Sequence, residues 1–261
     1  MVQWDAQDYR RNSSAQSQWA GELLQKIPLI GTERILDLGC GDGKVTLLLR
    51  DKVPNGSVVG IDNSLQMIEL AQKTFPSSQY PNLTFIRQDI RELAFDREFD
   101  LIFSNAVLHW IKDHSLILLR IAKALRENGK ICFQMGGRGN ASEIFEIIDS
   151  MICSPPWKEY FPNFEFPYGF YDVSTYQSWL NQAGLKPIRI ELIPKDMIHT
   201  EDGLKGWIRT TWLPYLQQIP SSLHEKFISQ IISMYKLKYL PDDAGKLHIK
   251  MMRLEVVAQK S

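Results

Sequence analysis

The sequence predicts an α/β fold built on a mostly parallel sheet, and two observations carry this prediction. Short apolar runs typical of buried strands recur along the first half of the chain, at 34–38, 57–61, 83–87, 99–104 and 130–135. Segments with apolar residues at helical intervals separate these runs, as at 44–53 and 114–125. Strands that alternate with helices in this way are joined by right-handed crossovers, which produce a parallel sheet flanked by helices.

The second half of the chain departs from this alternation. Residues 155–171 hold many aromatic residues and prolines and match neither a regular helix nor an ordinary strand. We expect two insertions, at about 141–180 and 200–245, to form a helical and aromatic cap. Strands at 187–193 and 249–258 would complete a seven-stranded sheet. The predicted division is therefore a core over 1–140, followed by 141–261 with the cap and the last two strands.

Composition excludes several classes of protein. Thirty basic and thirty acidic residues cancel, so the charge offers no footprint for nucleic acid or for an anionic membrane. The three cysteines are widely spaced without a CxxC motif, which is typical of reduced thiols. No signal peptide and no membrane-spanning run is evident. We expect a cytoplasmic protein without a metal site, while its oligomeric state stays open.

The stretch ILDLGCGDG at 35–43 runs from a strand into alternating glycines. A dinucleotide fingerprint counted from Gly39 would need its third glycine at position 44, which is Lys44, and a phosphate-binding P-loop also fails. Asp37 precedes the first glycine by two residues. A carboxylate there repels a pyrophosphate but suits a cationic ligand such as an aminoacyl nucleoside, whose ammonium Asp37 could neutralise.

Two further acids follow the next two strands. Asp62 ends SVVGID, where a carboxylate can accept hydrogen bonds from both ribose hydroxyls. Asp89 and the apolar Ile90 end the strand after it, where an adenine amino group could donate beside an apolar shelf. Any one of these acids alone is as readily a helix N-cap or a surface carboxylate. Their order and spacing together indicate a nucleoside site.

These motifs resemble those of the class I S-adenosylmethionine-dependent methyltransferases, most specifically over residues 33–136. FDLIFSNAVLHW at 99–110 and the opening WDAQDY at 4–9 add to the resemblance, the latter being similar to a helix that closes over the cofactor. The resemblance implies a Rossmann-like sheet, S-adenosylmethionine as cofactor and S-adenosylhomocysteine as product. It implies that the cofactor-binding residues are Asp37, Gly39, Cys40, Gly41, Asp62, Asn63, Met67, Asp89, Ile90 and Asn105.

For the methyl acceptor, the chain resembles two groups of carboxyl O-methyltransferases, those of trans-aconitate and those of juvenile hormone acid. The second resemblance implies that Gln16 and Trp110 hold the carboxylate of the acid, with His109 as a neighbour. A carboxylate is ionised at neutral pH and needs no general base, so catalysis would rest on alignment. His109 is open to two interpretations, a base for a phenol or amine, or a hydrogen-bonded histidine of the fold.

The aromatic stretch 155–171 and the lack of an obvious arginine cluster favour a small, largely apolar carboxylic acid as the acceptor. The sequence therefore predicts an O-methyltransferase that converts such an acid to its methyl ester. The alternatives are a polycarboxylate such as trans-aconitate, or a phenol or amine with His109 as base. A protein or RNA methyltransferase would share the core, but RNA is disfavoured by the balanced charge.

Overall fold

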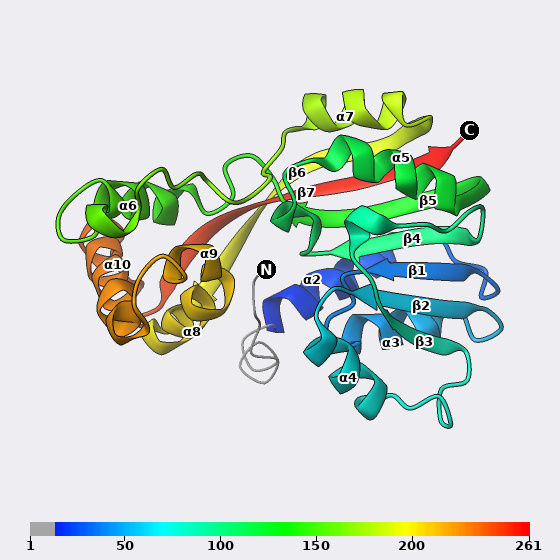
Figure 1. Ribbon diagram of the computed structural model, residues 1–261, viewed down its shortest axis with the longest axis horizontal. Helices are drawn as coiled ribbons and strands as arrows, with labels where there is room; N and C mark the ends of the chain where they lie inside the picture. Colours follow the sequence, from blue (N-terminus) through cyan, green and yellow to red (C-terminus); the bar gives the residue numbers. More distant parts are fainter. Residues whose placement is uncertain (1–13) are drawn as a thin grey trace. The chain divides into compact units, whose positions relative to one another are not determined.

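A computed structural model describes residues 14–261, with side chains from residue 19 onward. Seven strands form one sheet in the order β3-β2-β1-β4-β5-β7-β6 (Figure 1). They are β1 (Arg34–Leu38), β2 (Ser57–Asp62), β3 (Leu83–Arg87), β4 (Phe99–Asn105), β5 (Leu125–Gly136), β6 (Leu185–His199) and β7 (Leu247–Lys260). β1 to β5 are parallel, and β7 is antiparallel to β5. This confirms the predicted α/β, Rossmann-like fold with its mostly parallel seven-stranded sheet.

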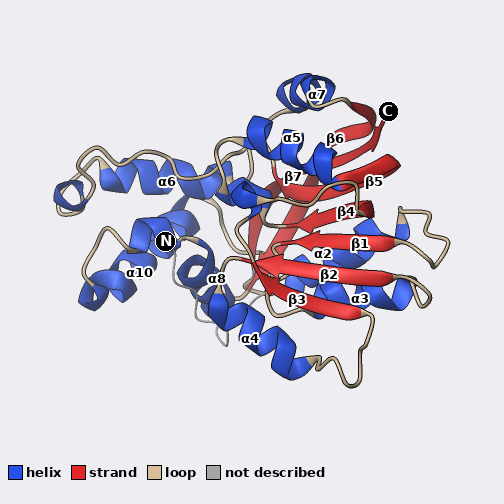
Figure 2. Ribbon diagram, turned by 45° about the vertical axis from the view of Figure 1, so that its right-hand side comes forward, coloured by secondary structure: helices blue, strands red, loops and turns tan. Residues whose placement is uncertain are grey.

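Helices cover both faces of the parallel strands (Figures 1 and 2). One face carries α2 (Ser14–Gln25), α3 (Lys44–Lys52) and α4 (Leu65–Thr74), whose apolar residues join those of β1 to β4 in one buried cluster. The other face carries α5 (His114–Ala124) and α7 (Val173–Gln182). Both faces of the strands are therefore buried, which explains why they read as continuous apolar runs.

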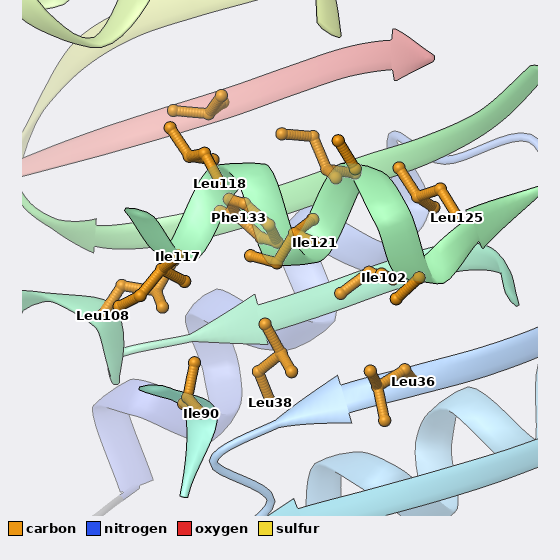
Figure 3. Close-up of a cluster of buried hydrophobic side chains, with 14 of the residues drawn as sticks. Leu36, Leu38, Ile90, Ile102, Leu108, Ile117, Leu118, Ile121, Leu125 and Phe133 are labelled. Carbon is orange, nitrogen blue, oxygen red and sulfur yellow. The ribbon is translucent and has the colours of Figure 1, made fainter. Parts of the chain in front are cut away.

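The cluster beneath α5 shows how this packing is built (Figure 3). Ile117, Leu118 and Ile121 follow one another at helical spacing, and each is at most 3% exposed. They pack with Leu36 of β1 and Ile102 of β4 in the same cluster. The helical period of α5 thus presents one apolar face to the sheet and fixes the chain that leaves the carboxyl end of β4.

Side-chain caps mark where three of these helices begin. Ser64 accepts a hydrogen bond from the backbone N–H of Met67 at the start of α4. Asp113 caps α5 by accepting from Leu116, and Asp172 caps α7 by accepting from Thr175. These caps satisfy backbone donors that have no partner inside the helix. The helices therefore start directly after the loops at the sheet edge.

The described chain divides into two compact units. The sheet unit comprises 14–138, 168–193 and 253–261, and the helical unit comprises 139–167 and 194–252. The helical unit holds α6 (Ser142–Ile152), η3 (Lys158–Tyr160), α8 (Glu201–Thr211), α9 (Leu213–Leu216), η4 (Ser221–Leu223) and α10 (His224–Lys238). These two units do not test the predicted division of the chain at residue 140 or the two predicted cap insertions, which stay predictions.

Aromatic side chains form much of the core of the helical unit. Trp157 is 1% exposed, and its indole N–H donates to Oε1 of Gln230 on α10 over 2.9 Å. Phe161 lies 6.0 Å from Phe227 between ring centroids, and Tyr215 lies 4.7 Å from Phe164. These rings pack against one another as core residues, at separations typical of favourable aromatic pairs.

Membrane-spanning helices and metal-binding clusters are both absent from the described part of the chain. None of the helices within residues 14–261 combines the length and the apolar run needed to cross a bilayer. Within the same residues, no group of three or more His, Cys, Asp or Glu side chains is arranged to hold a metal ion. Cys40 and Cys132 are buried thiols, and Cys153 is an exposed one.

Candidate cofactor and acceptor site

Three acidic residues lie at one edge of the sheet. Asp37 lies near the carboxyl end of β1, Asp62 ends β2, and Asp89 follows β3. Because these strands are parallel, their carboxyl ends share the edge at which ligands bind in open α/β sheets. The fold therefore brings together the three acids that the sequence singled out.

The glycine turn after β1 holds a conformation that side chains resist. Gly39, Gly41 and Gly43 have φ angles of 73°, 53° and 82°, in the left-handed region that favours glycine. A Cβ on Gly39 would lie 2.4 Å from both methyl carbons of Val107. A Cβ on Gly41 would meet no atom of the described chain within 4 Å, so this backbone borders open space.

Asp62 anchors the glycine turn. Its Oδ2 accepts the backbone N–H of Gly41 over 3.1 Å, and its Oδ1 accepts that of Ser64 over 2.8 Å. Burial raises the pKa of Asp62, while these backbone donors lower it. Each carboxylate oxygen has two lone pairs. Asp62 can therefore hold the turn and still accept hydrogen bonds from a ligand.

Asp37 is 2% exposed and accepts a hydrogen bond from the Thr46 hydroxyl over 2.7 Å. Burial raises its pKa to about 7, the Thr46 hydrogen bond opposes this, and the charge of Asp62 adds to it. A nearby cation would favour the ionised forms of Asp37 and Asp62. The negative charge of a pyrophosphate would be repelled by these carboxylates. The residues present therefore fit S-adenosylmethionine, which carries a sulfonium and an ammonium group.

The raised pKa of Asp37 predicts how replacing it with asparagine changes stability. Because the pKa in the folded protein lies above the unfolded value, the contribution of Asp37 to stability is full at low pH and is lost as pH rises through about 7. We expect the stability of Asp37→Asn relative to wild type to increase by about 2–3 kcal/mol between pH 5 and pH 8. Thermal denaturation without cofactor measures this, and an equal difference at both pH values would contradict it.

Asp89 and Ile90 lie at the start of η1 (Ile90–Glu92). The Asp89 carboxylate accepts from the Arg91 guanidinium, with Nη2 to Oδ2 at 2.6 Å, and this pair lowers the pKa of Asp89. Its Oδ1 also accepts the Arg91 backbone N–H over 2.8 Å. Asp89 therefore caps η1 in the structure, and its contact with adenine stays a prediction. Ile90 is buried in the cluster beneath α5.

The other predicted cofactor residues differ in what they present. The Cys40 side chain packs in the core of the α2 face, so only its backbone is available to a ligand. Met67 is 4% exposed on α4, and Asn63 lies between the end of β2 and the cap of α4. Asn105 ends β4, and Ala106 after it has a φ of 59°, unusual for a residue other than glycine.

His109 and Trp110 belong to the short helix η2 (Leu108–Trp110), which follows β4. His109 is buried, and its Nδ1 accepts the backbone N–H of Gly136 over 3.4 Å. Burial lowers the pKa of His109 well below its ordinary value, with the charge of Arg253 as the next cause. The imidazole is therefore neutral and weakly basic at neutral pH. Trp110 is half-buried beside it.

His114 positions this segment, a role that the sequence analysis missed. Its Nε2–H donates to the backbone oxygens of Leu108 and Ile111, which lie 2.8 and 2.9 Å away. The Tyr176 hydroxyl lies 3.2 Å from Nδ1 and donates to it in this tautomer. His114 thus ties the η2 turn to α5 and α7. A histidine at the start of a predicted helix gives no specific signal of such a contact.

Gln16 lies in the first turns of α2, and its side chain falls outside the described part of the chain. The opening WDAQDY also lies outside the described residues. The predicted pairing of Gln16 and Trp110 on a carboxylate therefore stays a prediction.

Comparison with known proteins identifies the class that this edge of the sheet indicates. A family model described as a methyltransferase domain matches residues 31–161, and the chain belongs to this family. It is 27% identical to the trans-aconitate 2-methyltransferase of Methylobacterium nodulans over 100% of both chains. It is 29% identical to that of Variovorax paradoxus, over 100% of this chain and 99% of the relative.

Solved structures show the same fold at lower identity. The phosphoethanolamine N-methyltransferase 2 of Haemonchus contortus, in complex with S-adenosylhomocysteine, superposes with a TM-score of 0.62 at 20% identity. That match covers 98% of this chain and 57% of the other. A geranyl diphosphate methyltransferase in complex with S-adenosylmethionine gives a TM-score of 0.58 at 15% identity, covering 94% and 85%. The protein is an S-adenosylmethionine-dependent methyltransferase, as the sequence predicted.

Proposed function

We propose that this protein transfers the methyl group of S-adenosylmethionine to a carboxylate oxygen of a small polycarboxylic acid, giving a methyl ester. The observation that carries the proposal is the similarity to trans-aconitate 2-methyltransferases along the whole chain. Carboxyl methylation also agrees with the buried, weakly basic His109, because an ionised acceptor needs no base.

We propose a separate role in cofactor binding for each of the three acids. Asp62 accepts hydrogen bonds from the ribose hydroxyls while it holds the Gly41 amide. Asp37 faces the cationic end of the cofactor, and Asp89 accepts from adenine beside Ile90. The backbone of Gly41 borders the space that the ligand would fill. The bound cofactor supplies a sulfonium methyl as the electrophile.

At the acceptor end, the residues orient a nucleophile that is already charged. The Trp110 indole N–H and the Gln16 amide donate to the carboxylate oxygens, and Asn105 lines the end of β4 beside them. Because the acid is ionised near neutral pH, the rate depends on the alignment of oxygen, methyl carbon and sulfur. The Gly136 hydrogen bond to His109 and the His114 contacts hold η2 in place for this alignment.

We expect kcat to depend little on pH near neutrality. His109 stays neutral between pH 6 and 8 because burial lowers its pKa well below the ordinary value, and the acceptor is already ionised in this range. With saturating cofactor, kcat should change by less than about twofold over this range. We expect His109→Asn to keep the flat profile, since an asparagine can still accept a hydrogen bond. A steep rise that disappears in His109→Asn would instead identify a base and a phenol or amine acceptor.

A largely apolar monoacid is the second candidate. It is favoured by the rings of Tyr168 and Phe170, which stack with centroids 5.5 Å apart beside His109. The aromatic residues of the helical unit weaken this candidate, because Trp157 and its neighbours pack as core. Initial rates with trans-aconitate and with medium-chain and terpenoid monoacids separate the two. A kcat/KM at least tenfold higher for trans-aconitate supports the polycarboxylate, and the reverse order supports the apolar acid.

A further inference from the structure

Arg253 is a buried cation at the edge of the sheet that carries the candidate site. It lies in β7, is 3% exposed, and pairs across the antiparallel ladder with Gly136 of β5. Gly136 in turn donates its backbone N–H to Nδ1 of His109. The strand register and this hydrogen bond place Arg253 near the segment that follows β4.

The surroundings of Arg253 combine an aromatic face with positive charge. Its guanidinium carbon lies 5.0 Å from the ring centroid of Trp19 on α2, within the range of a cation–π contact. Burial lowers the pKa of His109, and the charge of Arg253 lowers it further, so the imidazole stays neutral. Arg253 thus carries the positive charge at this point. A desolvated guanidinium interacts strongly with an anion, because little water screens the pair.

The acid on the same face of β7 is engaged elsewhere. Glu255 lies two residues along the strand and is fully buried. Its carboxylate oxygens accept from Lys26 over 2.8 Å, from Arg189 over 2.9 Å and from Gln134 over 2.9 Å. This group joins α2, β5 and β6 and accounts for Glu255 as part of the fold. It also leaves α2 fixed at its carboxyl end beside Arg253.

We propose that Arg253 is a specificity-determining residue that binds a carboxylate of the acceptor other than the one that is methylated. The inference rests on the proposed function, since it assigns a residue to the polycarboxylate. A guanidinium on the reacting carboxylate would withdraw electron density from the attacking oxygen and slow the transfer. On a second carboxylate, it positions the acid without that penalty. The planar fork of arginine suits this role, because it can bind a carboxylate through two parallel hydrogen bonds.

The test compares Arg253→Gln with wild type on two acids. We expect KM for trans-aconitate to rise about 30-fold, the scale of a hydrogen bond to a charged group, while kcat stays within about threefold. KM for a medium-chain monoacid should stay unchanged, because that acid has no second carboxylate. Arg253→Lys keeps the charge but not the planar fork, so its KM for trans-aconitate should lie between those of wild type and Arg253→Gln. If Arg253 had only a structural role, its replacement would change KM for both acids to a similar extent.

Arg138→Gln is the matched control. Arg138 lies just beyond β5 at the same edge, but its side chain is 70% exposed and pairs with Asp172 over 2.9 Å. We expect this variant to keep the wild-type KM for both acids. An unchanged KM for trans-aconitate in Arg253→Gln, or an equal rise in both arginine variants, would overturn the inference.

Calorimetry separates this inference from the proposed function. Titration with S-adenosylhomocysteine and thermal denaturation establish that each variant is folded, and Arg253→Lys serves if Arg253→Gln is not. Titration with trans-aconitate in the presence of S-adenosylhomocysteine then reports acid binding without turnover. If wild type methylates no acid yet binds trans-aconitate through Arg253, the proposed function fails and the inference stands. If wild type binds no trans-aconitate, or if Arg253→Gln and Arg253→Lys both bind it as tightly as wild type, the inference fails.

Discussion

Gly39→Ala is expected to destabilise the protein by about 3 kcal/mol and to abolish cofactor binding at ordinary concentrations. Gly39 has a φ of 73°, and an added Cβ would lie 2.4 Å from both methyl carbons of Val107. Either the turn or the segment after β4 must move, and both border the candidate site. Thermal denaturation and calorimetry with S-adenosylhomocysteine measure the two effects.

Two variants separate the clash from the backbone strain in this prediction. In Gly39→Ala with Val107→Ala, the two methyl carbons at 2.4 Å are gone but the Cβ of residue 107 at 2.8 Å remains, so only part of the lost stability should return. Gly41→Ala keeps a left-handed φ of 53° but meets no atom of the described chain within 4 Å. It should cost only about 1 kcal/mol of stability yet still weaken cofactor binding. If Gly41→Ala binds the cofactor normally, the open space beside Gly41 is not its site.

Asp62→Ala should weaken S-adenosylhomocysteine binding by about 2–3 kcal/mol, or about 30- to 150-fold. The change removes the acceptor of the ribose hydroxyls and also the contacts to the backbone of Gly41 and Ser64 at 3.1 and 2.8 Å. Calorimetry gives the dissociation constant, with thermal denaturation to establish that the variant is folded.

Asp62→Asn provides the comparison for this change. Asparagine retains one oxygen acceptor for the backbone but loses the charge that strengthens hydrogen bonds to the ribose. We expect it to keep more stability than Asp62→Ala while still losing about tenfold in affinity. A folded Asp62→Ala variant with the wild-type dissociation constant would remove Asp62 from the site.

The core strands could be predicted because burial on both faces gives them continuous apolar runs. β1 and β3 lie at the predicted residues, whereas β6 and β7 extend beyond the prediction at both ends. Polar residues recur through β6, in which only Leu185 and Met197 are buried, so its full length gave a weak signal in the sequence. Helix α6 carried a readable pattern that the sequence analysis did not use, with Ile144, Ile147, Ile148 and Met151 at helical intervals.

At the candidate site, the acids at the strand ends could be predicted because strand order and spacing place them. The contacts of His114 and Arg253 could not, because both depend on packing between segments distant in sequence. His114 contacts η2 and α7 together, and Arg253 is buried beneath Trp19 of α2. The sequence does not reveal that an arginine in an apolar strand is buried, because this depends on which helix covers the strand.

The most direct test of the account is methyl transfer itself. The protein is incubated with S-adenosylmethionine labelled in its methyl group and with trans-aconitate, and the product is identified by mass spectrometry. The account predicts a labelled monomethyl ester that releases labelled methanol in mild alkali, together with S-adenosylhomocysteine. A label that resists alkali, or no transfer to trans-aconitate or to any acid of the panel by folded protein that binds the cofactor, would contradict it.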